Sequence, residues 1–184
     1  RKRIKMVISD LHLGKERVIE DGGTNPFEEF FFNNKLIEFV RYYMTGEYQD
    51  YDVELIINGD FLNFLQVDYK GHYLTVITES ISLHKLKTIV AGHDLVFETL
   101  KEFASVENRS ISYVVGNHDQ CMLWPSTRAY LNEVLGTSIR YKNLVYFVDG
   151  VHIEHGHMHE AANRFDPRKF FLKKFSKGLK RYIF

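Results

Sequence analysis

The sequence predicts a single α/β domain with mixed sheets flanked by helices, and three features support that class. Short apolar runs of strand type alternate with longer segments of helical type, as in chains that build βα units. Four of the apolar runs end directly on Asp, His or Asn, which is typical of strands that stop at the edge of a sheet. The pair Asp149-Gly150 separates two further runs and predicts an antiparallel hairpin.

The N-terminal part of the chain is expected to hold one strand and one helix. The strand ends near Ile8, and the polar, glycine-containing segment 13–23 is expected to be a loop. Asn25-Pro26 has the character of an N-cap and a first helical position, with Glu28 three residues after the cap. The pattern therefore predicts a helix that starts there and stops at Gly46.

The later elements follow from the same periodicities and turn signals. In chain order they are a strand over 54–57, an irregular aromatic stretch over 61–74, helices over 75–91 and 95–105, a strand over 111–115, a short helix from Pro125 to Gly136, and hairpin strands over 143–148 and 151–155.

Size and composition limit the possible classes of protein. The 184 residues suit one domain with a sizeable core. No apolar run is long enough for a transmembrane helix, and the basic N-terminus lacks the long apolar run of a signal peptide. The single cysteine, Cys121, allows no internal disulfide and is interpreted as a small buried residue. These features favour a cytoplasmic protein.

The charge is uneven although the net charge is zero. Residues 168–184 are rich in Lys and Arg and contain no acid, so we treat 1–165 as the domain and 166–184 as a basic tail. Asp166-Pro167 predicts the start of an amphipathic helix in that tail. Its apolar face either covers the core, with the lysines in water, or lies on an anionic membrane near a lipid-linked substrate. Nucleic-acid binding is a further alternative, which the acidic body disfavours.

Polar side chains at four strand ends indicate a metal centre. Asp10 and His12 are two positions apart, so on an extended segment they point to the same side and can bind one ion. Asp60, Asn117 and His155 follow the other three runs. Each residue alone is more often a cap, a turn residue or a satisfied polar group. Together, mixed Asp, His and Asn ligands suit Mn²⁺, Fe or Zn²⁺, and their number suits two ions rather than one.

These motifs resemble those of calcineurin-like metallophosphoesterases. The matching residues are Asp10-Leu-His12, Gly59-Asp60, Gly116-Asn-His-Asp119 and His155-Gly156, and the resemblance covers about residues 4–165. Within that family the sequence around His155 to Phe165, with the helical tail that follows, looks like the branch containing UDP-diacylglucosamine hydrolases. The resemblance implies a β-sandwich flanked by helices, with two divalent metal ions at the strand ends.

The resemblance also implies roles for individual residues. Asp10 and His12 would hold the first metal, Asp60 would bridge, and Asn117 and His155 would hold the second. His118 would act as a general acid or stabilise charge in the transition state, and Asp119 would orient it. The residues expected to contact the substrate are Asn117, His118 and Arg164.

The closing Gly-His-x-His motif of the family has two possible assignments. We interpret His155-Gly156 as the family's earlier His-Gly, which implies a closing motif beyond residue 184 and an incomplete C-terminal part. Alternatively, Gly156-His157-Met158-His159 is itself the closing motif, and His157 and His159 are ligands.

The expected function is enzymatic hydrolysis of a phosphoester or pyrophosphate bond, with two divalent metal ions as cofactors. Mn²⁺ is the preferred metal, and Fe and Zn²⁺ are the alternatives. The expected partner is a phosphorylated small molecule, linked to a nucleotide or a lipid, with possible peripheral membrane contact through residues 168–184. Three alternatives remain: a nuclease, a cyclic-nucleotide phosphodiesterase, and a non-catalytic interaction module on the same scaffold.

Overall fold

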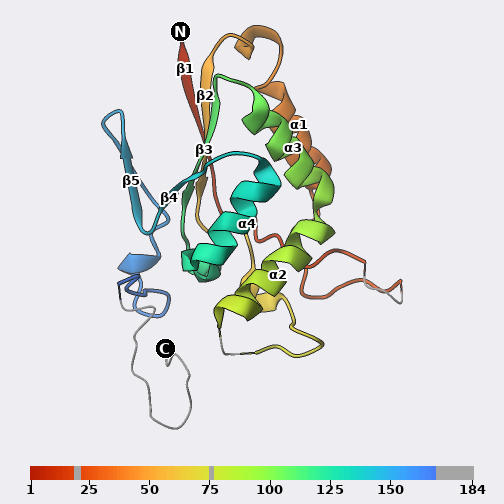
Figure 1. The fold of residues 1–184 in the computed structure, drawn as a ribbon. Coiled ribbons are helices and arrows are strands. Elements are labelled where there is room, and N and C mark those ends of the chain that lie inside the picture. Colours follow the sequence, from red (N-terminus) through yellow and green to blue (C-terminus); the bar gives the residue numbers. More distant parts are fainter. Residues whose placement is uncertain (19–21, 75–76, 169–184) are drawn as a thin grey trace.

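The computed structural model describes residues 1–18, 22–74 and 77–168 and confirms the α/β class. A parallel sheet has the strand order β1-β2-β3-β4, and β5 and β6 form a separate antiparallel sheet (Figure 1). The strands are β1 (Arg3–Ile8), β2 (Asp52–Asn58), β3 (Arg109–Val114), β4 (Arg140–Lys142), β5 (Val145–Val148) and β6 (Val151–Glu154). The helices are α1 (Asn33–Tyr42), α2 (Glu79–Gly92), α3 (Asp94–Ser105) and α4 (Pro125–Leu135), with short 3-10 turns η1 (Gly46–Tyr48), η2 (Phe64–Gln66), η3 (Gln120–Leu123) and η4 (His157–His159).

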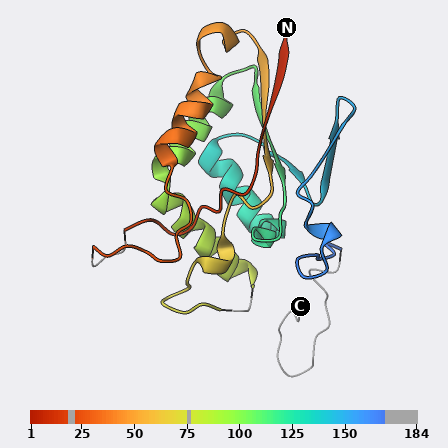
Figure 2. The same ribbon diagram turned by 180° about the vertical axis from the view of Figure 1, so that it is seen from behind.

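The helices lie on one face of the parallel sheet, and the β5-β6 hairpin lies on the other (Figures 1 and 2). The strands follow one another in chain order, and right-handed crossovers in one direction put every connecting helix on the same face. The main core fills the space between this face and the helices, and its buried members include Leu55 and Ile57 of β2 and Phe97 and Phe103 of α3.

A second, smaller core lies between the two sheets. It consists of Ile56 and Val114 from the parallel sheet and Tyr146 and Ile153 from the hairpin, all of them buried. Strands covered on both faces have nearly continuous apolar sequences, as β2 does. The parallel strands and the hairpin thus form two stacked sheets rather than one mixed sheet, an arrangement compatible with the predicted sandwich.

The predicted start of the first helix is wrong. Helix α1 begins at Asn33, eight residues after the expected cap Asn25. The Asn25 side chain instead accepts a hydrogen bond from the backbone N–H of Phe27 at 3.0 Å. The buried Glu28 carboxylate accepts from the backbone N–H groups of Gly14 and Phe30, both at 3.0 Å. The capping residues therefore close a loop against the segment after β1 instead of starting a helix.

The other elements lie close to those predicted, with two differences. Helix α2 starts at Glu79, after Thr78, whose hydroxyl accepts from the backbone N–H of Ile81. Strand β4 was not predicted. The expected tail helix lies outside the described residues from position 169 onward. None of the described helices combines the length and apolar character that crossing a bilayer requires.

Candidate metal centre

The segments that follow β1, β2, β3 and β6 meet at one end of the molecule, where the carboxyl ends of the parallel strands lie (Figure 1). Backbone hydrogen bonds join the first two segments beyond their strands. Asp10 donates its N–H to the carbonyl of Gly59 at 3.1 Å, and His12 donates to the carbonyl of Asp60 at 2.9 Å. The predicted ligands of β1 and β2 are thereby held side by side.

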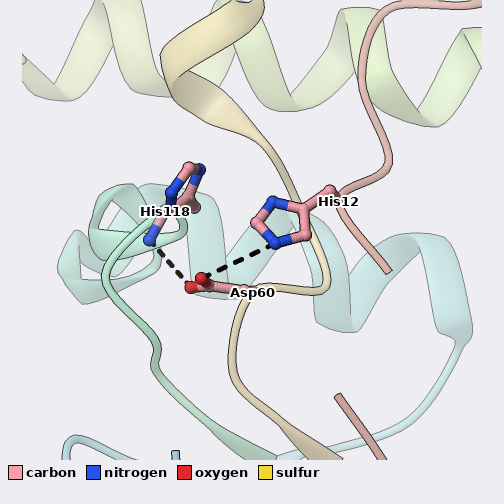
Figure 3. Close-up of side chains that lie close together, drawn as sticks. All are labelled: His12, Asp60 and His118. Atoms are coloured by element: carbon pink, nitrogen blue, oxygen red, sulfur yellow. Dashed lines mark hydrogen bonds and ion pairs between the residues drawn. The ribbon is translucent and has the colours of Figure 1, made fainter. Parts of the chain in front are cut away.

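Two clusters of possible ligands share Asp60. One is His12, Asp60 and His118 (Figure 3), and the other is Asp10, Asp60 and His155; within each, one ligand atom per residue lies within 4.8 Å of the others. Oδ2 of the buried Asp60 lies 3.2 Å from Nε2 of His155 and 3.8 Å from Nε2 of His12. One carboxylate common to two groups of nitrogen and oxygen donors fits a pair of divalent ions.

The grouping of Asp10 and His12 differs from the one predicted. Both residues have left-handed backbone conformations, with φ of 57° and 54°, so they do not lie on an extended segment. Oδ1 of Asp10 lies 4.0 Å from Nε2 of His155, whereas the His12 ring packs edge-to-face on His118 at a centroid distance of 4.6 Å. Asp60 also has a positive φ, of 51°. Residues other than glycine are strained in the left-handed backbone conformation, and such strain is found most often at functional sites.

His155 is oriented by the end of β2. Its Nδ1 donates to the carbonyl oxygen of Asn58 at 3.0 Å, which leaves Nε2 to face Asp60. Burial disfavours the charged ring, but the hydrogen bond and the charge of Asp60 outweigh burial and raise the pKa of His155 to about 9. Burial likewise opposes ionisation of Asp60, yet His155 and the backbone N–H of His118 lower the pKa of Asp60. The two side chains form a charged pair.

Two glycines allow these residues to approach one another. A Cβ on Gly59 would collide with the His155 ring, and a Cβ on Gly116 would collide with the Asp60 carboxylate. The glycines that end these two strands therefore serve close packing within the site as well as the turn.

The expectation that Asp119 orients His118 is wrong. Asp119 is fully buried, and its carboxylate accepts hydrogen bonds from the Tyr113 hydroxyl and the Gly116 N–H, both at 2.5 Å. Burial raises the pKa of Asp119 to about 7. This carboxyl group stabilises the turn after β3, and the side chain that hydrogen-bonds to the His118 ring is Asn63, whose Oδ1 lies 3.2 Å from Nδ1 of His118.

The environment of His118 is half-buried and mixed in charge. Burial lowers the pKa of its ring, and the neighbouring His12 acts in the same direction, while Asp60 partly opposes the shift. Asn117, one position earlier, is half-buried and lines an apolar pocket together with His118. The predicted metal contact of Asn117 stays a prediction.

The candidate residues after β6 differ in how far they are buried. His159 is exposed, and its Nε2 lies 2.7 Å from Oε1 of Glu154. His157 is 6% exposed, stacks on Phe165 at 4.8 Å, and lies 5.5 Å from His155 between ring centroids. Neither ring nitrogen of His157 has a hydrogen-bond partner among the described residues. The Arg164 side chain is exposed, and its contact with substrate stays a prediction.

Two residues near the site were missed by the sequence analysis, Asn63 and Glu29. Asn63 is fully buried and stands three residues after Asp60, so a polar residue within the apolar run 61–65 was the available signal. Glu29 contacts Asn63 from a segment more than 30 residues earlier, and no local pattern marks it.

Comparisons with known proteins do not assign the chain to a family. No protein-family model matches the chain, and searches of curated proteins and of solved structures found no match.

Proposed function

We propose that this chain hydrolyses phosphoester or pyrophosphate bonds with the help of two divalent metal ions. The observation that carries the proposal is the Asp60 carboxylate shared by two ligand clusters. The left-handed backbone at Asp10, His12 and Asp60 supports it, because strained residues persist where the surrounding structure holds them for a purpose. The resemblance of these motifs to calcineurin-like metallophosphoesterases agrees with the same reaction class.

The residues divide into groups that would hold the ions and groups that would act on the substrate. Asp10 and His155 would hold one ion, His12 the other, and Asp60 both. The amide oxygen of Asn117, which follows β3, would be a further ligand. When bound, two such ions activate water and neutralise charge on phosphoryl oxygens. Mixed nitrogen and oxygen donors suit Mn²⁺, with Fe and Zn²⁺ as alternatives.

His118 is placed to act on the leaving group. Its Nδ1 faces Asn63, so Nε2 remains available for the substrate. A protonated ring at this position would give a proton to the leaving oxygen.

A pocket beside His118 and Asn117 supports a substrate with an apolar part. The empty space in and in front of this pocket, open solvent included, is about 460 Å³, and its walls include Phe64 and Ile81. The buried Lys85 also lines it, with Nζ donating to the Phe64 carbonyl at 3.0 Å. Such a pocket suits a phosphorylated compound linked to a nucleotide or a lipid.

The test is metal-dependent hydrolysis by the full chain. The substrates are p-nitrophenyl phosphate, bis(p-nitrophenyl) phosphate, a nucleoside diphosphate sugar, cyclic AMP and single-stranded DNA, each with added Mn²⁺. Turnover of only DNA or only cyclic AMP would favour the nuclease or cyclic phosphodiesterase alternative, and no turnover would favour an interaction module.

The matched variants are Asp60→Asn and, as a control on the exposed surface, Asp50→Asn. Loss of an outer-shell partner typically costs about 10–100-fold, so loss of the shared ligand is expected to cost more in metal affinity and rate. Full turnover and normal metal content in Asp60→Asn would refute the proposal.

A further inference from the structure

Glu29 joins three side chains around the candidate centre although it belongs to none of the motifs. Its Oε2 accepts a hydrogen bond from Nδ2 of Asn63 at 3.2 Å and lies 3.5 Å from Nδ1 of His12. Its Oε1 accepts from Nε2 of Gln66 at 3.1 Å. One carboxylate therefore contacts the segment after β1 and the segment after β2.

The backbone around Glu29 is fixed on both sides. Glu28 is buried and bonds to the backbone of Gly14 and Phe30, and Phe30 is itself buried. Glu29 is partly exposed, with 46% of its side chain accessible, but it extends from an anchored segment. Its three contacts therefore follow from the loop packing rather than from a freely moving surface side chain.

The contact with Asn63 decides which way the Asn63 amide points. A carboxylate only accepts hydrogen bonds, so Asn63 must turn its Nδ2 toward Glu29. Its Oδ1 then faces Nδ1 of His118 at 3.2 Å, which makes Nδ1 the donor and leaves Nε2 free. Without the Glu29 carboxylate, the Asn63 amide loses the hydrogen bond that favours this orientation.

The contact with His12 acts in the same way on a candidate ligand. Nδ1 of His12 is buried and has no hydrogen-bond partner among the described residues, and the nearby Glu29 carboxylate favours a proton on it. Nε2 of His12 then carries the lone pair on the side of Asp60, 3.8 Å from Oδ2. A carboxylate behind a histidine ligand is a common device for fixing the ring and its tautomer.

We infer that Glu29 is a positioning residue that sets the ring orientation and tautomer of both His12 and His118. The kinetic part of this inference rests on the proposed hydrolysis, but the structural part does not. Glu29→Met keeps the length of the side chain and removes the acceptors. Glu38→Gln is the matched control, because Glu38 is exposed on α1 and pairs only with the exposed Lys35 among the described residues.

The first measurement is nitrogen NMR of the histidine rings of the full chain, at a pH where they are neutral. His12 and His118 are expected as Nδ1–H tautomers in the wild type and in Glu38→Gln, and as mixtures in Glu29→Met. Mn²⁺ affinity is expected to fall about 10-fold in Glu29→Met, as for other residues that support a ligand.

A compensating pair separates positioning from general stability. Asn63→Asp sets two carboxylates against each other and is expected to slow hydrolysis. Glu29→Gln combined with Asn63→Asp restores a donor and an acceptor, because the introduced amide donates to the introduced carboxylate. This double variant is expected to recover a single His118 tautomer but not the Nδ1–H tautomer of His12, because an amide nitrogen takes the place of the oxygen that faces His12.

The inference is overturned if Glu29→Met keeps wild-type tautomers and metal affinity. It is also overturned if the His118 tautomer of the double variant is as mixed as that of Asn63→Asp, a comparison that holds even if Glu29→Met fails to fold. If the wild type shows the expected tautomers but hydrolyses none of the substrates, the proposed function fails and the positioning role stands.

Discussion

The ring of His118 has one nitrogen committed to Asn63 and the other available, which defines its predicted role in the reaction. His118→Ala is expected to keep bound metal and to lower the rate by about 10²–10⁴-fold for substrates with poor leaving groups. The loss should be smaller for nitrophenyl esters, whose leaving oxygen needs less help. The check is a comparison of kcat across leaving groups of graded pKa, with metal content measured on the same samples.

Two outcomes would change this assignment. An equal loss for every leaving group would argue against proton donation. Loss of metal in His118→Ala would make His118 a ligand, which its position within the His12 and Asp60 cluster permits.

His157 and His159 can be compared to test whether Gly156-His157-Met158-His159 supplies a metal ligand. His157 is buried beside His155, with its ring nitrogens unpartnered among the described residues, whereas His159 faces Glu154 at the surface. We predict that His157→Gln lowers Mn²⁺ affinity and that His159→Gln leaves it unchanged. Titration of these variants of the 184-residue chain with Mn²⁺, followed by electron paramagnetic resonance, checks this, and the reverse order of effects would contradict it.

At the scale of single residues, the sequence indicated which candidate ligands lie close together, but not how they are grouped around Asp60. The ends of β1, β2 and β3 meet at a common edge because parallel strands end together, and the hairpin stacked on that sheet brings the end of β6 to the same place. Asp10 and His12 lie in different clusters rather than side by side, and both have positive φ values and hydrogen bonds to the segment after β2 that a strand pattern does not reveal. Asn63 was missed for a related reason, because its contacts come from distant parts of the chain.

At the scale of elements, local signals succeeded where the element is self-contained. Helix α4 ends at Gly136 with a left-handed φ of 63°, and the hairpin turns at Asp149-Gly150, both as predicted. Helix α1 starts late because the apparent cap Asn25 and the following Glu28 bond to the backbone of the preceding loop, at Glu16 and Gly14. Strand β4 has only three residues without alternation, and pairing with β3 defines it.

The end of α2 is packed against the segment that carries His12. A Cβ on Gly92 would collide with the backbone carbonyl of Lys15. Helix propensity alone predicts that Gly92→Ala stabilises the protein by up to about 1 kcal/mol. We predict the opposite sign, a loss of about 1–3 kcal/mol, because the helix and the loop must separate. Urea unfolding decides between them, and a gain in stability would show that the loop yields without cost.

For the whole molecule, one buried carboxylate links the two sheets. Glu54 of β2 accepts hydrogen bonds from Lys5 and Ser112, both at 2.6 Å, and from the Tyr146 hydroxyl of the hairpin at 2.8 Å. Arg140 of β4 lies 3.4 Å away. The hairpin leads directly into His155, so this link also holds the site's last predicted ligand against β2.

The same carboxylate predicts how stability depends on pH. Burial works against ionisation of Glu54, but Lys5, Ser112 and Tyr146 outweigh it and lower the pKa. A folded pKa below the unfolded one gives stability that is present above the ordinary carboxyl value of 4.5 and is lost as pH falls through the lower, folded value. Glu54→Gln should therefore cost about 1.5–3 kcal/mol at neutral pH, as for a hydrogen-bonded charged group, and should flatten the loss of stability in that acid range.

The control for this prediction is Glu102→Gln, which removes an exposed carboxylate 3.2 Å from Arg41. An exposed pair of this kind contributes about 0–1 kcal/mol, so its removal should leave both the stability and its pH dependence nearly unchanged. Chemical unfolding of the three proteins across the acid range is the measurement. If Glu54→Gln unfolds with the same pH dependence as the wild type, the acid sensitivity arises elsewhere, and the link between the sheets is held by the apolar contacts of Ile56, Val114 and Ile153.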